Sequence, residues 1–301
     1  MLRIPISLKL SNPRLSILQG SLKQCVVNAG RFSLQAQIDI RQKRLTTEVC
    51  WADLKSMDMI INPLRGTDPT LPIVAEEGGM HRKPALDCSG PVAVIDPIDG
   101  TLNYAEGGKH FGIAGSICWY DLHSDMLHPI YSIFYAPAVV DNVGMVFEAD
   151  SVSNRAWING RSFVPKQAPL PQNITTLYYR AKRVMSDDPA QNFFENKMMA
   201  SARFQGVPFQ RGLSALLSSI RTVIDPSFPC LSIRSSSKIW DMVTSHHFLE
   251  LCGGAARQHS NKSVFPIKWA DLVEQNDDDK GLFMPFPTIC GDARAVEAFF
   301  S

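Results

Sequence analysis

The chain has 301 residues, of which 45% are hydrophobic, so it is long enough to bury one large core or two fused ones. Thirty Lys and Arg residues nearly balance 29 Asp and Glu residues, and the net charge of +1 gives no overall field that would attract nucleic acid or an anionic membrane. No apolar run approaches the ~18–20 residues needed to cross a bilayer, so we expect neither nucleic acid nor a membrane as a partner.

The seven cysteines are scattered, without a Cys-x-x-Cys pair or a Cys/His cluster of zinc spacing. Such a set predicts free thiols in a reducing compartment, and we expect a cytoplasmic protein. The first 38 residues contain basic but no acidic side chains, so a targeting segment in residues 1–15 is the alternative. A first amphipathic helix explains this region better, because apolar residues recur at helical spacing: Leu15, Leu18, Leu22, Val26 and Val27.

Downstream elements fall into two groups along the chain. After a polar loop at 41–47, a second helix is predicted at about 53–62, bounded by Pro63 and Gly66. Short apolar runs separated by Gly, Pro, Asp and Asn then predict the strands of one sheet, at 72–75, 92–95, 111–119, 130–135 and 143–147.

Beyond Asp150 the pattern is mixed, and it predicts a second α/β half. Helices are expected at about 190–202, 213–223 and 240–251, and strands at 230–233 and 281–284. The predicted organisation is an N-terminal α+β metal-binding half, residues 1–150, and a C-terminal α/β half, residues 151–301, that completes the site.

One segment contains several candidate site residues close together: an apolar strand ends in Asp96 and Asp99, with a proline between them. Their carboxylates and the Ile98 carbonyl are hard oxygen ligands suited to Mg²⁺. Gly100 allows a tight turn, after which backbone amides, including that of Thr101, would point at an anion. The alternative is an ordinary surface turn, since Asp, Pro and Gly are common turn residues.

Three further acids stand where other elements begin or end. Glu76 follows the apolar run 73–75, Asp53 begins the second predicted helix, and Asp241 precedes the last predicted helix. Taken singly, an exposed acid pair or a helix cap explains each of them. Taken together with the central segment, they indicate one shared site.

The combined pattern resembles the inositol monophosphatase superfamily: Glu-Glu after a strand, DPIDGTLNY after the next strand, and Trp-Asp before a helix that ends in Gly-Gly. The resemblance covers about residues 43–300 and includes the runs at 111–114 and 154–160. It implies an α/β (α+β) fold, a layered α-β-α-β-α sandwich of the inositol monophosphatase and fructose-1,6-bisphosphatase type. It also implies a homodimer, which the sequence neither supports nor excludes.

The resemblance further implies a site that holds two or three Mg²⁺ and hydrolyses a small phosphorylated metabolite with activated water. The implied metal ligands are Glu76, Asp96, the Ile98 carbonyl, Asp99 and Asp241. Asp53 and Thr101 would orient and deprotonate the water, with Glu76 also in the catalytic set. Gly100, Thr101, Arg234 and Asp241 would bind substrate.

Two departures from the family pattern bear on the substrate. Met242 to Ser245 replace the small residues that usually follow Trp-Asp, and Arg234 stands where inositol phosphatases usually have a Glu. An arginine suits a second anionic group. The default substrate is therefore an inositol monophosphate-like ester, with 3′-phosphoadenosine 5′-phosphate and fructose 1,6-bisphosphate as alternatives. A catalytically weakened binding or regulatory member is the alternative from another class.

Overall fold

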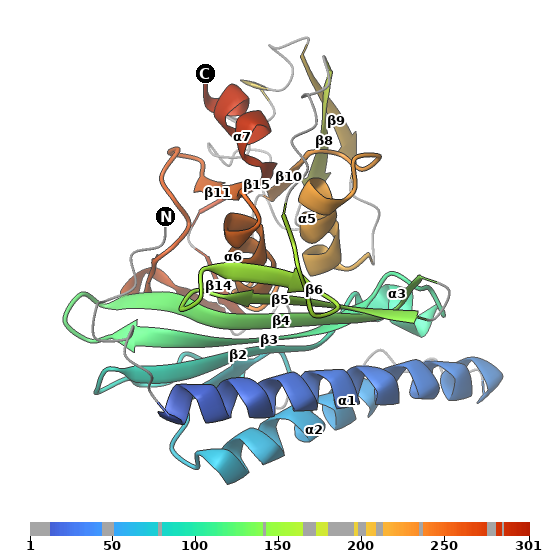
Figure 1. Ribbon diagram of the computed structural model, residues 1–301, viewed down its shortest axis with the longest axis vertical. Coiled ribbons are helices and arrows are strands. Elements are labelled where there is room, and N and C mark those ends of the chain that lie inside the picture. The colour runs from blue at the N-terminus through green and yellow to red at the C-terminus, as the bar shows by residue number, and fades with distance from the viewer. Residues whose placement is uncertain are drawn as a thin grey trace.

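The computed structural model describes residues 13–43, 51–77, 80–140, 143–164, 173–179, 196–197, 203–208, 213–234, 237–275, 281–284 and 286–301. Within these residues, helices and sheets alternate in layers: a helix pair, a large sheet, a second helix pair, a smaller sheet and a terminal helix (Figure 1). This arrangement confirms the predicted α-β-α-β-α sandwich. No helix in the described part of the chain is long and apolar enough to span a membrane.

The first layer is formed by α1 (Pro13–Lys43) and α2 (Trp51–Thr67), which pack against the large sheet. The predicted amphipathic helix is confirmed, since Leu15, Leu18 and Leu22 are buried. Both helices are longer than predicted, because α1 includes residues 41–43 and α2 continues through Pro63. A proline removes only one helical N–H donor, and the buried side chains around it hold the helix on the sheet: Ile60, Ile61 and Leu64.

The large sheet runs in the order β1-β2-β3-β4-β5-β6-β7, and β12 also pairs with β4. Its strands are β1 (Ile73–Ala75), β2 (Gly90–Asp99), β3 (Gly112–Asp121), β4 (Met126–Val140), β5 (Val143–Asp150), β6 (Arg155–Ile158), β7 (Arg161–Ser162) and β12 (Ile267–Lys268). All five strands predicted for this region are present. The sheet continues past residue 150, and the division into halves at that residue stays a prediction.

The middle layer contains α5 (Ala215–Ile224) and α6 (Val243–Leu251); α6 contacts strands of both sheets, and α5 packs on the smaller sheet and shares a core cluster with β4 and β5. The helix predicted at 213–223 is confirmed, and the helix predicted at 240–251 begins three residues later, at Val243. Most of the helix predicted at 190–202 lies outside the described residues.

The smaller sheet has the order β11-β15-β10-β8-β9. Its strands are β8 (Ile174–Tyr179), β9 (Phe204–Pro208), β10 (Leu231–Arg234), β11 (Gly254–Gln258) and β15 (Thr288–Asp292), and α7 (Ala293–Phe300) covers its outer face. Only β10 was predicted. A separate pair, β13 (Val273–Gln275) and β14 (Gly281–Phe283), contains the other predicted strand, and a 3₁₀ turn, η2 (Trp269–Asp271), follows β12.

Candidate active site

Parallel pairing of β1 with β2 brings two predicted acids to one sheet edge. Ala75 lies opposite Ile95 in this pair, and Glu76 and Asp96 are the next residues of the two segments. Asp99 follows where the register of β2 against β3 shifts. The buried sheet thus positions these three carboxyl groups through backbone pairing.

Two helical segments add Asp53 and Asp241. Asp53 is buried in the first turn of α2, and Asp241 lies in the turn that precedes α6. The charges of all four other acids act on Asp96, so the five form one electrostatic group, called here the acid cluster: Asp53, Glu76, Asp96, Asp99 and Asp241.

Burial and mutual repulsion raise the pKa values within the acid cluster. Burial, and then the charge of Asp241, raises the pKa of Glu76 to about 8. Burial raises the pKa of Asp99 to about 6, although a hydrogen bond from Ser214 opposes the change. Burial, followed by the charges of acidic neighbours, raises the pKa of both Asp53 and Asp96 well above the usual range. The acid cluster therefore keeps its negative charges only where a cation, either protons or a metal ion, offsets them.

Whether a metal ion fits the acid cluster can be judged from the hydrogen-bond partners of its buried carboxylate oxygens. Both carboxylate oxygens of Asp53 and both of Asp96 are buried without a hydrogen-bond partner. Such groups are costly unless a cation or donor satisfies them, and hard divalent ions prefer carboxylate oxygens. Within the described ranges, no group of three or more Asp, Glu, His or Cys side chains is arranged so that it could hold a metal ion as it stands. The donor types nevertheless fit Mg²⁺, and for Asp53 the unpartnered oxygens argue against a helix-cap role.

The turn after β2 depends on a glycine. Gly100 has φ of +89° and precedes the short helix α3 (Thr101–Ala105). A Cβ atom at this position would lie 2.9 Å from the His110 carbonyl oxygen and 2.9 Å from the Ser214 nitrogen. The Thr101 hydroxyl donates a 2.9 Å hydrogen bond to the Ile98 carbonyl, so two predicted site groups contact each other.

Replacing Gly100 by Ala should lower the free energy of unfolding by about 2 kcal/mol, because the left-handed backbone and the close backbone contacts both disfavour a side chain. Urea unfolding measures the change. Gly20→Ala is the matched control, because a Cβ there has nothing within 4 Å on helix α1, and it should be neutral or slightly stabilising. Equal stability of the native protein and Gly100→Ala would contradict this account of the turn.

Asp99 also joins the sheet to the N-terminus of α5. Its carboxylate accepts hydrogen bonds from the Ser214 hydroxyl, from the Ala215 amide at 2.8 Å and from the Leu216 amide at 2.7 Å. Sequence reasoning did not identify Ser214 in this role. The available signal was a serine near the start of a predicted helix; in the structure it is the N-cap, and its hydroxyl accepts a bond from the Leu217 amide.

Arg234 lies beside the acid cluster, in the interior of the protein. Its side chain is 3% exposed on β10, and its guanidinium donates to the Ala215 carbonyl, to the Ser219 hydroxyl at 2.9 Å and to the Asp241 carbonyl at 3.3 Å. Because these groups belong to α5 and to the turn before α6, the arginine fixes two elements beside the site. That Arg234 binds substrate stays a prediction.

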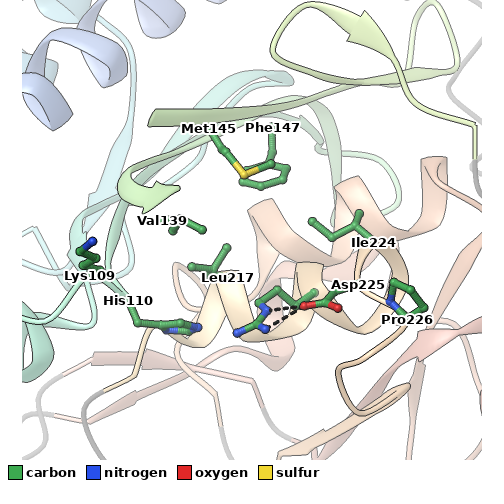
Figure 2. A pocket seen from close by; sticks show the side chains of 10 residues that line it. Lys109, His110, Val139, Met145, Phe147, Leu217, Ile224, Asp225 and Pro226 are labelled. Atoms are coloured by element: carbon green, nitrogen blue, oxygen red, sulfur yellow. Dashed lines mark hydrogen bonds and ion pairs between the residues drawn. The ribbon is translucent and has the colours of Figure 1, made fainter. Parts of the chain in front are cut away.

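A pocket of about 400 Å³ lies on the flank of α5 (Figure 2). It is lined by Lys109, His110, Val139, Met145, Phe147, Leu217, Arg221, Ile224, Asp225 and Pro226. His110 links it to the site, since its Nδ1 accepts a 3.1 Å hydrogen bond from the amide of Ser214, and the hydroxyl of the same serine donates to Asp99. The lining contains no member of the acid cluster, so this pocket is separate from the predicted phosphate site.

Comparison with known proteins gives local sequence matches and extensive structural matches. The chain is 32% identical to human inositol monophosphatase 2 over 96 residues and 35% identical to Nus factor SuhB of Pseudomonas aeruginosa over 81 residues. These stretches cover 28% and 26% of this chain, and only 33% and 28% of the two relatives.

Solved structures match over most of both chains. Inositol monophosphatase from Anabaena (Nostoc) sp. has a TM-score of 0.63 at 20% identity, covering 95% of this chain and 94% of its own. Inositol monophosphatase II from Staphylococcus aureus has a TM-score of 0.63 at 18% identity, covering 93% and 92%. At these identities the likeness shows the fold. The model of the inositol monophosphatase family matches residues 19–283, and the chain therefore belongs to the inositol monophosphatase family.

Proposed function

We propose that this protein is a Mg²⁺-dependent phosphatase that hydrolyses a small phosphate monoester by attack of water. The observation that carries the proposal is the acid cluster, whose Asp53 and Asp96 contribute four buried, unpartnered carboxylate oxygens at the edge of the large sheet. Membership of a phosphatase family supports the same chemistry. An inositol monophosphate-like ester is the default substrate.

Each group in the site has a role in this proposal. Bound Mg²⁺ would supply positive charge that makes water more acidic and neutralises phosphate oxygens. Glu76, Asp96, Asp99, Asp241 and the Ile98 carbonyl would hold it. Asp53 would accept the proton of the attacking water, and Thr101 would orient that water. The Gly100 turn would direct backbone amides at the phosphate.

The departures from the family pattern lie in the protein core. Met242, Val243, Thr244 and Ser245 are all buried, and Thr244 shares a 2.8 Å hydrogen bond with Ser116 of β3. These residues take part in the packing of α6 on the sheet, and a catalytically weakened binding member stays the alternative from another class. Arg234 is buried as well, and the preference for a substrate with a second anionic group that it suggested stays a prediction.

The test is phosphate release by the purified protein from four esters: inositol 1-phosphate, 3′-phosphoadenosine 5′-phosphate, fructose 1,6-bisphosphate and an aryl phosphate. We expect release with Mg²⁺ and none with EDTA, and the ester with the highest kcat/KM defines the substrate class. If folded protein that binds Mg²⁺ released phosphate from none of them, the proposal would fail and the binding-member alternative would replace it.

A further inference from the structure

A lysine lies within reach of the acid cluster. The Lys238 ammonium is 3.5 Å from a carboxylate oxygen of Glu76, and the two side chains are 18% and 26% exposed. Lys238 is three residues before Asp241, in the segment that leads into α6. The predicted cation site therefore has a protein cation beside one of its ligands.

Packing holds the Lys238 side chain more firmly than the side chain of a lysine in a typical surface ion pair. Its backbone forms a β-bridge with Phe283 of β14, and its Nζ lies 5.7 Å from the centroid of the Trp240 ring. Its aliphatic stem lies beside Gly281, where an added Cβ would be 3.1 Å from the Lys238 Cδ. A long side chain held along its stem loses less conformational entropy when its charged end forms a pair.

The Lys238 ammonium and a metal ion would both interact with the carboxylate of Glu76. The positive charge of Lys238 offsets the repulsion that Asp241 and Asp99 exert on Glu76. Bound Mg²⁺ would offset the same repulsion with twice the charge, and it would repel the ammonium. Pairing with Lys238 and coordination of Mg²⁺ are therefore competing states of Glu76.

We propose that Lys238 is a built-in counter-ion of the acid cluster, which stabilises the cation-free protein and raises the Mg²⁺ concentration needed to load the site. The inference rests on the proposed function, because it assumes that the cluster binds Mg²⁺. Lys238 acts here as a positioning residue through Glu76, and the inference requires no contact between the lysine and substrate.

The test is to add MgCl₂ alone to the protein and to measure the thermal unfolding midpoint at each MgCl₂ concentration. In EDTA, Lys238→Met should unfold at a lower temperature than the native protein, and its half-saturating Mg²⁺ concentration should be about fivefold lower. Lys238→Gln should behave in the same way, and Lys238→Arg should stay close to native. Lys83→Met is the matched control, because the Lys83 ammonium lies 5.6 Å from the Trp269 ring, and this change should leave the Mg²⁺ dependence unaltered.

The outcomes separate this inference from the proposed function. An unchanged or higher half-saturating Mg²⁺ concentration in both Lys238→Met and Lys238→Gln, with a native protein that does respond to Mg²⁺, would overturn the counter-ion role alone. A native protein whose unfolding midpoint does not respond to Mg²⁺ would overturn both the counter-ion role and the proposed metal site.

Discussion

Replacing Asp99 by Asn should lower kcat/KM for Mg²⁺-dependent phosphate release by at least about a thousandfold. Asp99 would lose its negative charge as a metal ligand, and an amide accepts through only one oxygen where the carboxylate accepts from Ser214, Ala215 and Leu216. Steady-state phosphate release at saturating Mg²⁺ measures the effect, and circular dichroism establishes that the variant is folded.

Asp292→Asn is the matched control for this loss. Asp292 caps α7 by accepting a 2.9 Å bond from the Arg294 amide, but it is not part of the acid cluster. Because Asn caps a helix about as well as Asp, the control should keep its cap, lose only the charge that pairs with Arg294, and keep its turnover. Retention of more than about a tenth of native kcat/KM by Asp99→Asn would contradict a metal-ligand role for this residue.

Replacing Asp96 by Asn should make the cation-free protein more stable at pH 8, by about 1–3 kcal/mol, while abolishing turnover. Burial, and then the charge of Glu76, raises the pKa of Asp96 in the folded protein. A carboxyl group with a raised folded pKa binds its proton more tightly when folded. Its contribution to stability is therefore complete below about pH 4 and is lost as the pH rises toward the folded pKa.

The contributions of Asp99 and Glu76 to stability should also fall as the pH rises, because the pKa values of these groups are raised to about 6 and about 8. In EDTA the native protein should therefore lose stability between about pH 4 and pH 8, and Asp96→Asn should lose less. Urea unfolding at pH 5 and pH 8 measures this. Asp68→Asn is the control, and it should lower the stability at pH 8. Hydrogen bonds from Arg14 and Thr70 lower the pKa of Asp68 despite its burial. A less stable Asp96→Asn at pH 8 in EDTA would contradict the account.

The large sheet was predictable because its signals are local. Its strands from β2 to β5 follow one another along the chain as antiparallel neighbours, and each is an apolar run bounded by turn residues. The smaller sheet was predicted only at β10, because its strands pair over long separations. Leu231, for example, pairs with Thr176, and β11 reads Gly-Ala-Ala-Arg-Gln, which has no strand periodicity.

The acids of the site were accessible to sequence reasoning, whereas the groups that position them were not. Glu76 and Asp96 end two consecutive apolar runs, and a parallel pair places such ends together. Ser214, Arg234 and Lys238 depend on how distant elements pack, as in the contact of Arg234 with α5. A residue type at a motif position could not reveal that the Arg234 side chain faces the interior between α5 and the turn before α6.

The claim that the acid cluster is a cation centre is tested most directly by binding of Mn²⁺, a spectroscopic substitute for Mg²⁺. The electron paramagnetic resonance signal of free Mn²⁺ is followed while native protein and Asp96→Asn are added. We expect the native protein to bind Mn²⁺ and to release it when Mg²⁺ is added, and Asp96→Asn to bind at least about tenfold more weakly. Equal Mn²⁺ affinity in both proteins, or no binding to the native protein, would contradict the assignment of the cluster as the metal site.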